Sequence, residues 1–359
     1  MEYGHGGDIY TYKDMLDFSV NVNPFGMSGH VAEAAKRGVD LSGNYPDSRC
    51  RRLRQKLSEK TGLPMSYFVI GNGAADLFFS LVLAEKPRHA LIPVPAFSEY
   101  EQALRTVGCR VSTWQMKKEN GFCLTEDFTE ALEEDVDMVF LCSPSNPAGR
   151  TVHPDLLREI AARCEAKKIR LVLDECFVEF LDDPAAYSMA DETRNFCQLF
   201  VVRAFTKMHA VPGLRLGYGI TSDEALLEQI CQIRQPWSVS VPAQEAGIAA
   251  LDEEERAGKT RKYIRMERAR MEEAFARAGM EVVPSEANFI LVYTEKDLFE
   301  ELKKRGILIR DCSNYRGLGK GWYRMAVRLR EENDCLLGAV REICGEDGQT
   351  PGRKEEKTR

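Results

Sequence analysis

The chain has 359 residues, of which 44% are hydrophobic and 29% are charged, a composition typical of a soluble globular protein. Its formal net charge of −7 argues against a nucleic-acid-binding surface, which needs concentrated positive charge. No apolar run approaches the roughly 18 residues that a membrane span requires, and the first residues contain no secretory signal. Eleven cysteines without a CxxC pair or zinc-site spacing favour reduced thiols and no bound metal. We therefore expect a cytoplasmic protein with neither a nucleic-acid nor a membrane partner.

The first predicted unit is an N-terminal arm, residues 1–32, whose many Gly, Asn and Pro residues predict little regular structure. A large domain, residues 33–252, follows. In it, apolar runs such as HALIPV, DMVFLCSP, IRLVLDE and QLFVVR alternate with amphipathic helical patterns. Such runs indicate a mainly parallel sheet that is covered by helices on both faces. Thr221 and Glu224 predict a capping box at the start of the helix TSDEALLEQI.

Beyond Asp252 the pattern changes to a smaller α+β domain, residues 253–344. A long charged helix comes first, EEERAGKTRKYIRMERARMEEAFARAG. It is followed by the short apolar runs EVVP, NFILVY, ILIRDC and WYRMAV, and by a last helix, ENDCLLGAVREIC. Residues 345–359 are polar and charged, and we expect a disordered tail there.

Four features at the ends of predicted strands suggest a ligand site. Lys207 follows QLFVVR, Asp174 ends IRLVLDE, and Asn146 lies in SPSNPAG after another strand. Residues 71–76, GNGAAD, join a strand to a helix and so offer free backbone N–H groups to an anion. Each feature alone has a structural interpretation as a solvated loop residue, a turn or a cap. Together, at the strand ends where α/β sheets bind ligands, they favour a shared site.

These parts match what pyridoxal phosphate needs: a lysine for its aldehyde, an aspartate for its pyridine nitrogen and an anion cradle for its phosphate. The order GNGAAD, PAFSEY, SPSNPAG, DECFVEF, FTKMHAVPGLRLGYG resembles the fold type I pyridoxal-phosphate enzymes of the histidinol-phosphate aminotransferase group. The resemblance spans roughly residues 17–340. It implies an α/β fold with a mainly parallel sheet in a large domain plus a smaller α+β domain, and pyridoxal 5′-phosphate as the cofactor.

The resemblance also assigns roles to residues. Lys207 would carry the cofactor covalently as the catalytic residue, Asp174 would bind the pyridine nitrogen and Asn146 the ring hydroxyl. Phe97 is placed to cover one ring face. Tyr45 would reach the cofactor phosphate of a neighbouring subunit, which implies a homodimer with shared active sites. The expected phosphate ligands of the same subunit are Gly73, Ala74, Ala75, Thr206 and Arg215.

Two positions depart from the pattern of the group. Ala204 stands where many relatives have serine, which removes one hydroxyl from the phosphate site. Phe177 stands where most aminotransferases have a tyrosine that hydrogen-bonds the ring oxygen. Both changes predict either weaker cofactor binding or a different outcome of the reaction.

A second signature lies near the two ends of the chain. HGGDIY, DFSVNVNPFG, QPWSVSVPAQEAG and IRDCSNYRGLGKGWYRMAVR together resemble the L-threonine-O-3-phosphate decarboxylase family of cobalamin biosynthesis. Arginines suit a substrate with both a carboxylate and a phosphate, and Arg328, with the same strand parity as Arg324, is a further candidate. The substrate contacts implied by the resemblance are His5, Gly6, Asn23, Asn146, Arg310 and Arg324.

The implied reaction is decarboxylation of L-threonine O-3-phosphate to 1-amino-2-propanol O-2-phosphate, the linker of the cobalamin nucleotide loop. O-Phospho-L-serine is an alternative substrate, because one methyl group is worth only ~1–3 kcal/mol of discrimination. A histidinol-phosphate-type aminotransferase would use the same cofactor residues, and a non-catalytic amino-acid sensor could use the same fold. Without these motifs, the arginines would be interpreted as surface charges and His5 as part of a frayed arm.

Overall fold

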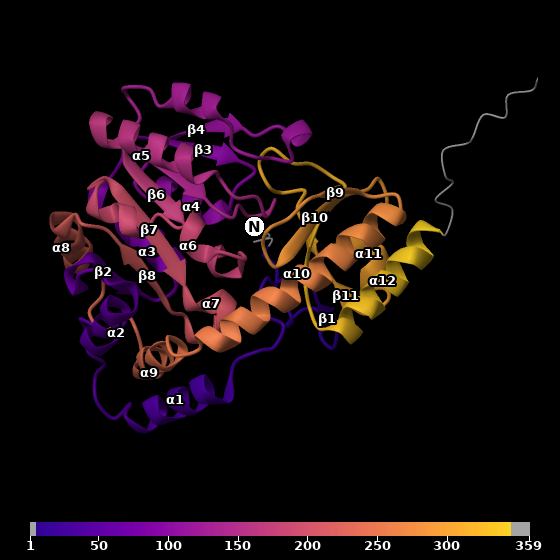
Figure 1. Cartoon of the computed structure of the whole chain (residues 1–359), viewed down its shortest axis with the longest axis horizontal. Coiled ribbons are helices and arrows are strands. Elements are labelled where there is room, and N and C mark those ends of the chain that lie inside the picture. The colour runs from indigo at the N-terminus through magenta and orange to yellow at the C-terminus, as the bar shows by residue number, and fades with distance from the viewer. Residues whose placement is uncertain (1–4, 346–359) are drawn as a thin grey trace, which may run out of the picture.

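The computed structural model of the chain describes residues 5–345 (Figure 1). A seven-stranded sheet with its helices forms one part of the molecule, and a four-stranded sheet with three helices forms the other. The predicted disordered tail, apart from Gly345, lies outside the described residues. The predicted domain boundaries remain a prediction, although the two sheets fall within residues 33–252 and 253–344.

The large sheet has the strand order β2-β8-β7-β6-β5-β3-β4. All neighbours from β4 to β7 are parallel, and only β8 runs antiparallel to its two neighbours. The mainly parallel sheet predicted from the apolar runs is therefore confirmed. The strands are β2 (Phe68–Gly71), β3 (His89–Val94), β4 (Arg110–Gln115), β5 (Met138–Cys142), β6 (Arg170–Asp174), β7 (Leu199–Ala204) and β8 (Gly217–Ile220).

Helices bury both faces of this sheet, because alternate strand residues point to opposite sides. On one face, strand residues such as Phe140 and Val172 pack with α3 (Ala74–Glu85), α4 (Ser98–Arg105) and α8 (Glu224–Ile233). On the other, Val139 and Leu171 pack with α2 (Arg51–Thr61), α5 (Pro154–Lys167) and α9 (Val241–Ala250). Helix α1 (Gly29–Asp40) lies against α9, and the short α6 (Pro184–Tyr187) and α7 (Phe205–Met208) follow β6 and β7.

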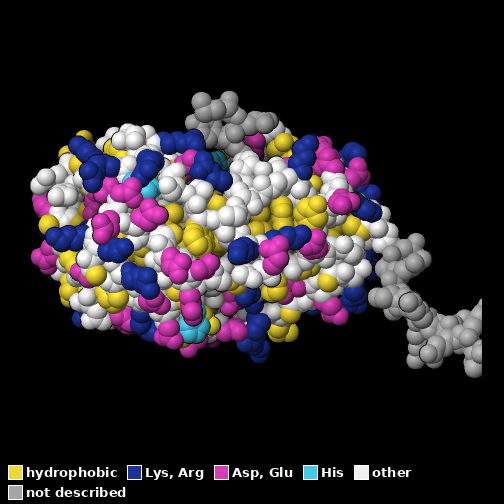
Figure 2. Space-filling model, turned by 90° about the horizontal axis from the view of Figure 1, so that it is seen from above, with side chains coloured by type: hydrophobic (Ala, Val, Ile, Leu, Met, Phe, Trp, Pro, Cys, Tyr) yellow, Lys and Arg dark blue, Asp and Glu magenta, His cyan; other side chains and the backbone are white. Residues whose placement is uncertain are grey.

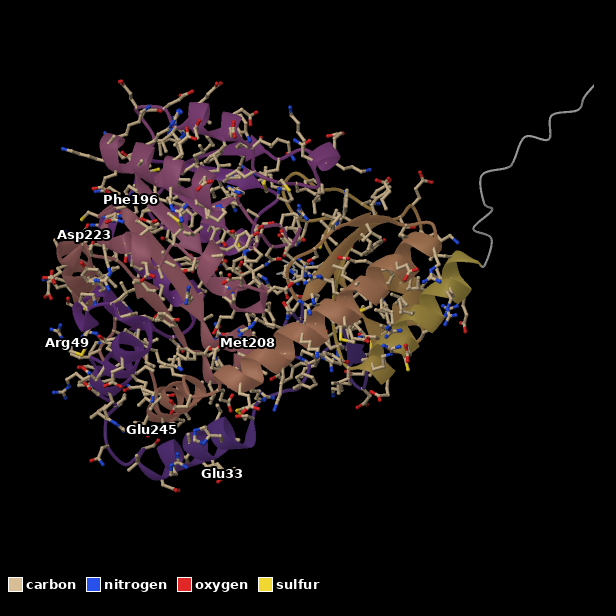
Figure 3. The ribbon with its side chains drawn as sticks, viewed as in Figure 1. Glu33, Arg49, Phe196, Met208, Asp223 and Glu245 are labelled. Carbon is tan, nitrogen blue, oxygen red and sulfur yellow. The ribbon has the colours of Figure 1, made fainter. Side chains whose placement is uncertain are left out.

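The predicted capping box of α8 is wrong. Asp223, labelled in Figure 3, is the capping residue, and its carboxylate accepts a hydrogen bond from the backbone N–H of Leu226 at 3.0 Å. Thr221 lies two residues before Asp223, and its hydroxyl accepts a hydrogen bond from the N–H of Asp223 at 3.2 Å. A carboxylate next to the first helical turn also interacts favourably with the helix dipole.

The small sheet is antiparallel in the order β12-β13-β10-β9. Its core is formed with the long helix α10, where Met271 and Phe275 are fully buried against Phe289 and Met325. In Figure 1, α10 runs from the large domain across to the small sheet. The elements are β9 (Glu281–Val283), β10 (Phe289–Tyr293), β12 (Arg310–Asp311), β13 (Trp322–Ala326), α10 (Glu254–Arg277), α11 (Leu298–Lys303) and α12 (Arg330–Cys344).

The N-terminal arm contributes a strand that the sequence did not predict. β1 (Leu16–Asp17) pairs in parallel with β11 (Ile307–Leu308). The next residue, Phe18, is fully buried, and its carbonyl accepts a hydrogen bond from the N–H of Ala326 in β13 at 2.9 Å. The arm is therefore attached to the small domain before the chain enters α1.

On the face shown in Figure 2, side chains of both charges are interspersed. Within residues 5–345, no helix combines the length and apolar character needed to cross a bilayer. All eleven cysteines lie in this range and none forms a disulfide.

Candidate active site

Three of the predicted cofactor residues lie at the carboxyl edge of the large sheet. Asp174 is the last residue of β6, and it pairs with Cys142 at the end of β5. Asn146 lies in the loop that follows β5, and Lys207 lies in α7, directly after β7. Met208, next to Lys207, is labelled in Figure 3 where α10 approaches the large domain. The parallel strands thus bring residues from three separate motifs to one place.

Lys207 has a half-buried side chain whose Nζ lies 5.4 Å from the centre of the Phe177 ring. Burial is the largest influence on its pKa, which is lowered, and the guanidinium of Arg324 lowers it further. The carboxylate of Asp174 acts in the opposite direction but does not cancel the shift. A lysine with a lowered pKa provides more of the neutral amine, the form that attacks an aldehyde.

Asp174 is buried, and each of its carboxylate oxygens accepts a hydrogen bond. Oδ1 accepts from the N–H of Cys176 at 2.9 Å, and Oδ2 accepts from the hydroxyl of Tyr100 at 2.6 Å. Burial raises the pKa of Asp174, while these hydrogen bonds act against that rise. The arrangement presents a carboxylate in a place shielded from water, where it can bind a protonated ring nitrogen.

A cradle for an anion lies at the start of α3. Gly73 precedes the helix with φ +89°, and the first N–H groups of a helix have no carbonyl partner within it. A Cβ at Gly73 would lie 2.6 Å from a terminal nitrogen of Arg215, so the guanidinium lies directly against the helix start. Thr206 is buried beside Lys207, in α7. Unpaired N–H groups and a guanidinium in contact form a suitable site for a phosphate.

These groups fit pyridoxal phosphate. The cradle suits the phosphate, Asp174 the ring nitrogen and Lys207 the aldehyde, all at one edge of one sheet. Phe97, which is half-buried, directly precedes α4 near the same edge. Phe177 packs edge-on against Phe289 at 5.0 Å, so this position contributes an apolar wall rather than a hydroxyl.

Two arginines lie side by side on the small sheet. Arg310 in β12 is directly opposite Arg324 in β13. Residues opposite each other in an antiparallel pair project from the same face. Both guanidinium groups contact Tyr315: Arg324 donates to its hydroxyl at 3.3 Å, and Arg310 lies 5.2 Å from its ring centre. Arg310 also donates to Asn314 at 2.8 Å.

Arg324 in the small sheet contacts Asn146, which lies at the carboxyl edge of the large sheet. Its side chain is buried, and one terminal nitrogen donates to the side-chain oxygen of Asn146. The other donates to the carbonyl of Ser19 in the arm at 2.9 Å. Its Nε has no partner within residues 5–345. An anion held here would therefore lie between the two domains and the arm.

The arm closes over this region. Gly6 packs so tightly on Ser19 that a Cβ would lie 2.3 Å from the Ser19 carbonyl oxygen, and Gly7 donates to the Ser19 hydroxyl at 2.7 Å. His5 forms an ion pair with Glu99 at 3.3 Å. His5, Gly6 and Arg310 line one cavity. Burial raises the pKa of Glu99, and the neighbouring His5 opposes that rise.

Comparison with known proteins identifies the family. Residues 13–340 match the family described as aminotransferase class I and II. The chain belongs to this family. It is a pyridoxal-phosphate enzyme of fold type I, as the motif order predicted.

Individual members of the aminotransferase family resemble the chain over nearly its whole length. It is 36% identical to a threonine-phosphate decarboxylase of Salmonella typhimurium, over 94% of this chain and 96% of the relative. It is 35% identical to histidinol-phosphate aminotransferase 2 of Archaeoglobus fulgidus, over 92% and 94%. Among solved structures, the histidinol-phosphate aminotransferase from Clostridium acetobutylicum superposes with a TM-score of 0.86 at 30% identity, covering 92% of this chain and 99% of that one.

Two of the predicted site residues, Asn23 and Tyr45, do not line the cavity that His5, Gly6 and Arg310 form. The side-chain amide of Asn23 donates to the carbonyl of Met208 at 2.8 Å and to the hydroxyl of Thr260 at 3.0 Å, behind the Lys207 turn. Its predicted contact with substrate remains a prediction. Tyr45 is 79% exposed and stacks on Trp237 with ring centres 4.5 Å apart.

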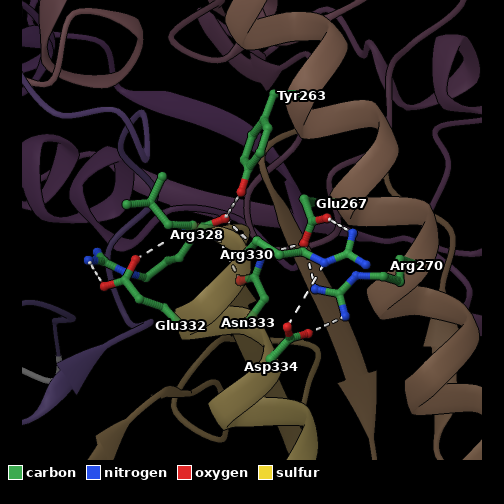
Figure 4. Close-up of polar contacts among 9 residues, drawn as sticks. Tyr263, Glu267, Arg270, Arg328, Arg330, Glu332, Asn333 and Asp334 are labelled. Carbon is green, nitrogen blue, oxygen red and sulfur yellow. Dashed lines mark hydrogen bonds and ion pairs between the residues drawn. The ribbon is translucent and has the colours of Figure 1, made fainter.

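Arg328 does not share the strand of Arg324, and the parity argument for it was wrong. β13 ends at Ala326, and the guanidinium of Arg328 donates to Glu332 at 2.7 Å. Figure 4 shows it at one end of a polar network between α10 and α12. This pairing within the small domain gives Arg328 a structural role.

Sequence reasoning missed three side chains that contact the site residues: Glu99, Tyr100 and Tyr315. The motif PAFSEY contains the first two, and Tyr100 follows Phe97 by three residues on the same helix face. That spacing could have suggested that both point to the cofactor edge. Tyr315 lies in an irregular loop, where no periodicity gives such a signal.

Proposed function

We propose that this enzyme decarboxylates L-threonine O-3-phosphate to 1-amino-2-propanol O-2-phosphate, for the nucleotide loop of cobalamin. The observation that carries the proposal is the pair Arg310 and Arg324, which lie directly opposite each other on β12 and β13. Arg324 also contacts Asn146, at the edge of the large sheet that holds Lys207. A substrate with a carboxylate and a phosphate needs two cationic anchors, and guanidinium groups bind both anions well. The 36% identity to a threonine-phosphate decarboxylase supports this assignment.

In the proposed reaction the protein's task is to orient the substrate. Bound pyridoxal phosphate supplies an electron sink that lets a bond at the substrate Cα break, and the bond held perpendicular to its ring is the one that breaks. Arg324, held by Asn146 and Ser19, would bind the carboxylate, and Arg310 the phosphate. His5 and Gly6 would cover the cavity and exclude water. In its protonated form Lys207, whose lowered pKa makes it a stronger acid, can donate to Cα the proton that replaces the departing CO2.

The proposal includes a homodimer with shared active sites. Tyr45 and Trp237 form an exposed aromatic pair, with exposed fractions of 79% and 47%. Large exposed aromatic side chains are enriched at protein interfaces. In the dimer, Tyr45 would reach the phosphate cradle of the other subunit.

The test uses the cofactor-loaded protein with L-threonine O-3-phosphate as the sole substrate. We expect CO2 release without any need for 2-oxoglutarate, and none from Lys207→Ala. Arg310→Gln should raise KM about 100-fold, because a charge-assisted bidentate contact is lost. Arg305→Gln is the matched control: it removes a half-buried arginine of the small domain that pairs with Glu301 and Glu342, and it should leave KM unchanged.

Formation of glutamate from 2-oxoglutarate without CO2 would contradict the proposal. It would favour a histidinol-phosphate-type aminotransferase, the activity named for the 35% identical relative. A higher kcat/KM for O-phospho-L-serine than for the threonine ester would keep the decarboxylase and change its substrate.

A further inference from the structure

We propose that Tyr100 is a positioning residue for the cofactor: through its hydroxyl it sets how the proton is shared between Asp174 and the ring nitrogen of pyridoxal phosphate. The inference depends on the cofactor and not on the substrate. It therefore holds whether the enzyme is a decarboxylase or an aminotransferase.

The geometry places Tyr100 directly behind Asp174. Tyr100 lies in the first turn of α4, is 1% exposed, and donates its hydroxyl hydrogen to Oδ2 of Asp174 at 2.6 Å. The N–H of Cys176 donates to the other oxygen at 2.9 Å. Each carboxylate oxygen thus has a protein donor, and the Cys176 thiol is a further hydrogen-bond partner of the same carboxylate.

The Tyr100 ring is held tightly, so its hydroxyl has little freedom to point elsewhere. It stacks on Phe140 with ring centres 5.0 Å apart and 18° between the planes. Phe78 contacts it edge-on at 5.0 Å, and Phe97 does so at 5.7 Å. Phe97 is the residue predicted to cover the cofactor ring. Residues 97–100 therefore supply both a proposed contact with that ring and the hydrogen bond to Asp174.

The chemical consequence follows from the burial of Asp174. A buried carboxylate is more basic than one in water, and a basic carboxylate takes the shared proton away from the pyridine nitrogen. A donor hydrogen bond stabilises the charged carboxylate and leaves the proton on the nitrogen. Since the protonated nitrogen makes the ring an electron sink, the Tyr100 hydroxyl should support the chemistry without touching the substrate.

The experiment compares three side chains at position 100 in the cofactor-loaded enzyme: tyrosine, phenylalanine and 3,5-difluorotyrosine. Tyr100→Phe removes the hydroxyl and keeps the ring, whereas 3,5-difluorotyrosine, introduced at the same position, is a stronger donor than tyrosine. Each protein is loaded with pyridoxal phosphate labelled with 15N in its ring, and the 15N chemical shift is measured by NMR. We expect the phenylalanine variant to shift toward an unprotonated pyridine and the difluoro variant in the opposite direction.

The matched control is Tyr323→Phe. Tyr323 is also buried, and its hydroxyl donates to the carbonyl of Lys296 at 3.2 Å in the small domain, so its loss should leave the 15N shift unchanged. In Tyr100→Phe, kcat should also fall about tenfold, the effect of losing one hydrogen bond to a charged group. If the phenylalanine variant takes up no cofactor, tyrosine and difluorotyrosine alone decide the question. Identical 15N shifts in the available position-100 proteins would overturn the inference and leave Tyr100 as a packing residue.

Discussion

At the scale of single residues, the phosphate cradle depends on the absence of a side chain at Gly73. This residue has φ +89°, where L side chains are strained, and a Cβ there would lie 2.6 Å from a guanidinium nitrogen of Arg215. The positive charge can lie against the start of α3 only because that space is empty. The cradle is therefore sensitive to a change of one methyl group.

We predict that Gly73→Ala weakens cofactor binding about 10- to 100-fold, because Arg215 must move and a charge-assisted hydrogen bond to the phosphate is lost. The measurement is an absorbance titration of the apoenzyme with pyridoxal phosphate. Gly279→Ala is the control: Gly279 has a similar φ of +79°, and a Cβ there would meet no atom within 4 Å. That variant should lose some stability and keep the cofactor Kd. Equal Kd values for both variants would contradict the steric argument.

The sequence predicted where Lys207 and Asp174 lie in the fold, but not which side chains contact them. Lys207 and Asp174 each follow an apolar run, and that local pattern places both at the sheet edge. The hydrogen bond from Tyr100 to Asp174 and the ion pair of His5 with Glu99 join residues that are far apart in the chain. Such pairings depend on how β3, β6 and the arm pack together, which no local pattern records.

At the scale of elements, α10 and α12 are joined by a buried carboxylate. Glu267 in α10 is 3% exposed and accepts hydrogen bonds from Arg330 at 2.6 Å and from Asn333 at 2.9 Å, as Figure 4 shows. Arg270 of the same helix donates to it at 2.6 Å. Burial alone would raise the pKa of Glu267, but the hydrogen bonds from these three residues outweigh it, and the pKa is lowered.

We predict that Glu267→Gln lowers the free energy of unfolding by about 1 to 2 kcal/mol at pH 7, because the buried carboxylate loses its charge, while its partners Arg270 and Arg330 are partly exposed to water. Since the folded pKa of Glu267 lies below its ordinary value of 4.5, this stability is present above that pH and is lost as the pH falls through the folded pKa. The two proteins should therefore converge in acid, as measured by urea denaturation at several pH values.

The control for that prediction lies on the same helix. Glu255 pairs with Lys259 at 2.7 Å, but its side chain is 85% exposed, so Glu255→Gln should leave the midpoint of unfolding unchanged. A constant gap between wild type and Glu267→Gln down to pH 3 would mean that packing, rather than charge, accounts for the loss.

Elements with a clear pattern were predicted, and those without one were not. The long buried strands of the large sheet and the charged helix α10 have periodicities that reveal them. β1 has only two residues, and it forms a strand only because it pairs with β11. The cap of α8 was misplaced by two residues, because both Thr221 and Asp223 are good capping residues and the choice depends on where the preceding strand ends.

At the scale of the whole molecule, shared active sites make a prediction about mixed subunits. Lys207→Ala lacks the catalytic amine, and Tyr45→Ala lacks the side chain proposed to reach the other subunit. In a hybrid dimer, one site would combine the intact Lys207 of one chain with the intact Tyr45 of the other. We expect the mixture of the two variants to reach up to one quarter of wild-type activity after they are unfolded together and refolded, because roughly half of the dimers are hybrids with one intact site.

The controls are each variant refolded alone, and light scattering to establish that dimers form. Activity of the mixture equal to the sum of the separate proteins would mean that each site is built within one chain. In that case Tyr45 and Trp237 would be a surface pair without a role in the cofactor site.

The strand pairing of the arm sets an order of events when the protein is made. Asp17 pairs with Leu308, and the carbonyl of Ser19 binds the Arg324 side chain, so the partners of the arm emerge about 290 residues later. At typical rates of synthesis this delay is roughly 15 to 60 seconds. During that time the arm has no strand to join, although the large sheet can already form. Lys207 is therefore in place before the cavity around it is closed, and we expect activity only after the arm has paired with the small domain.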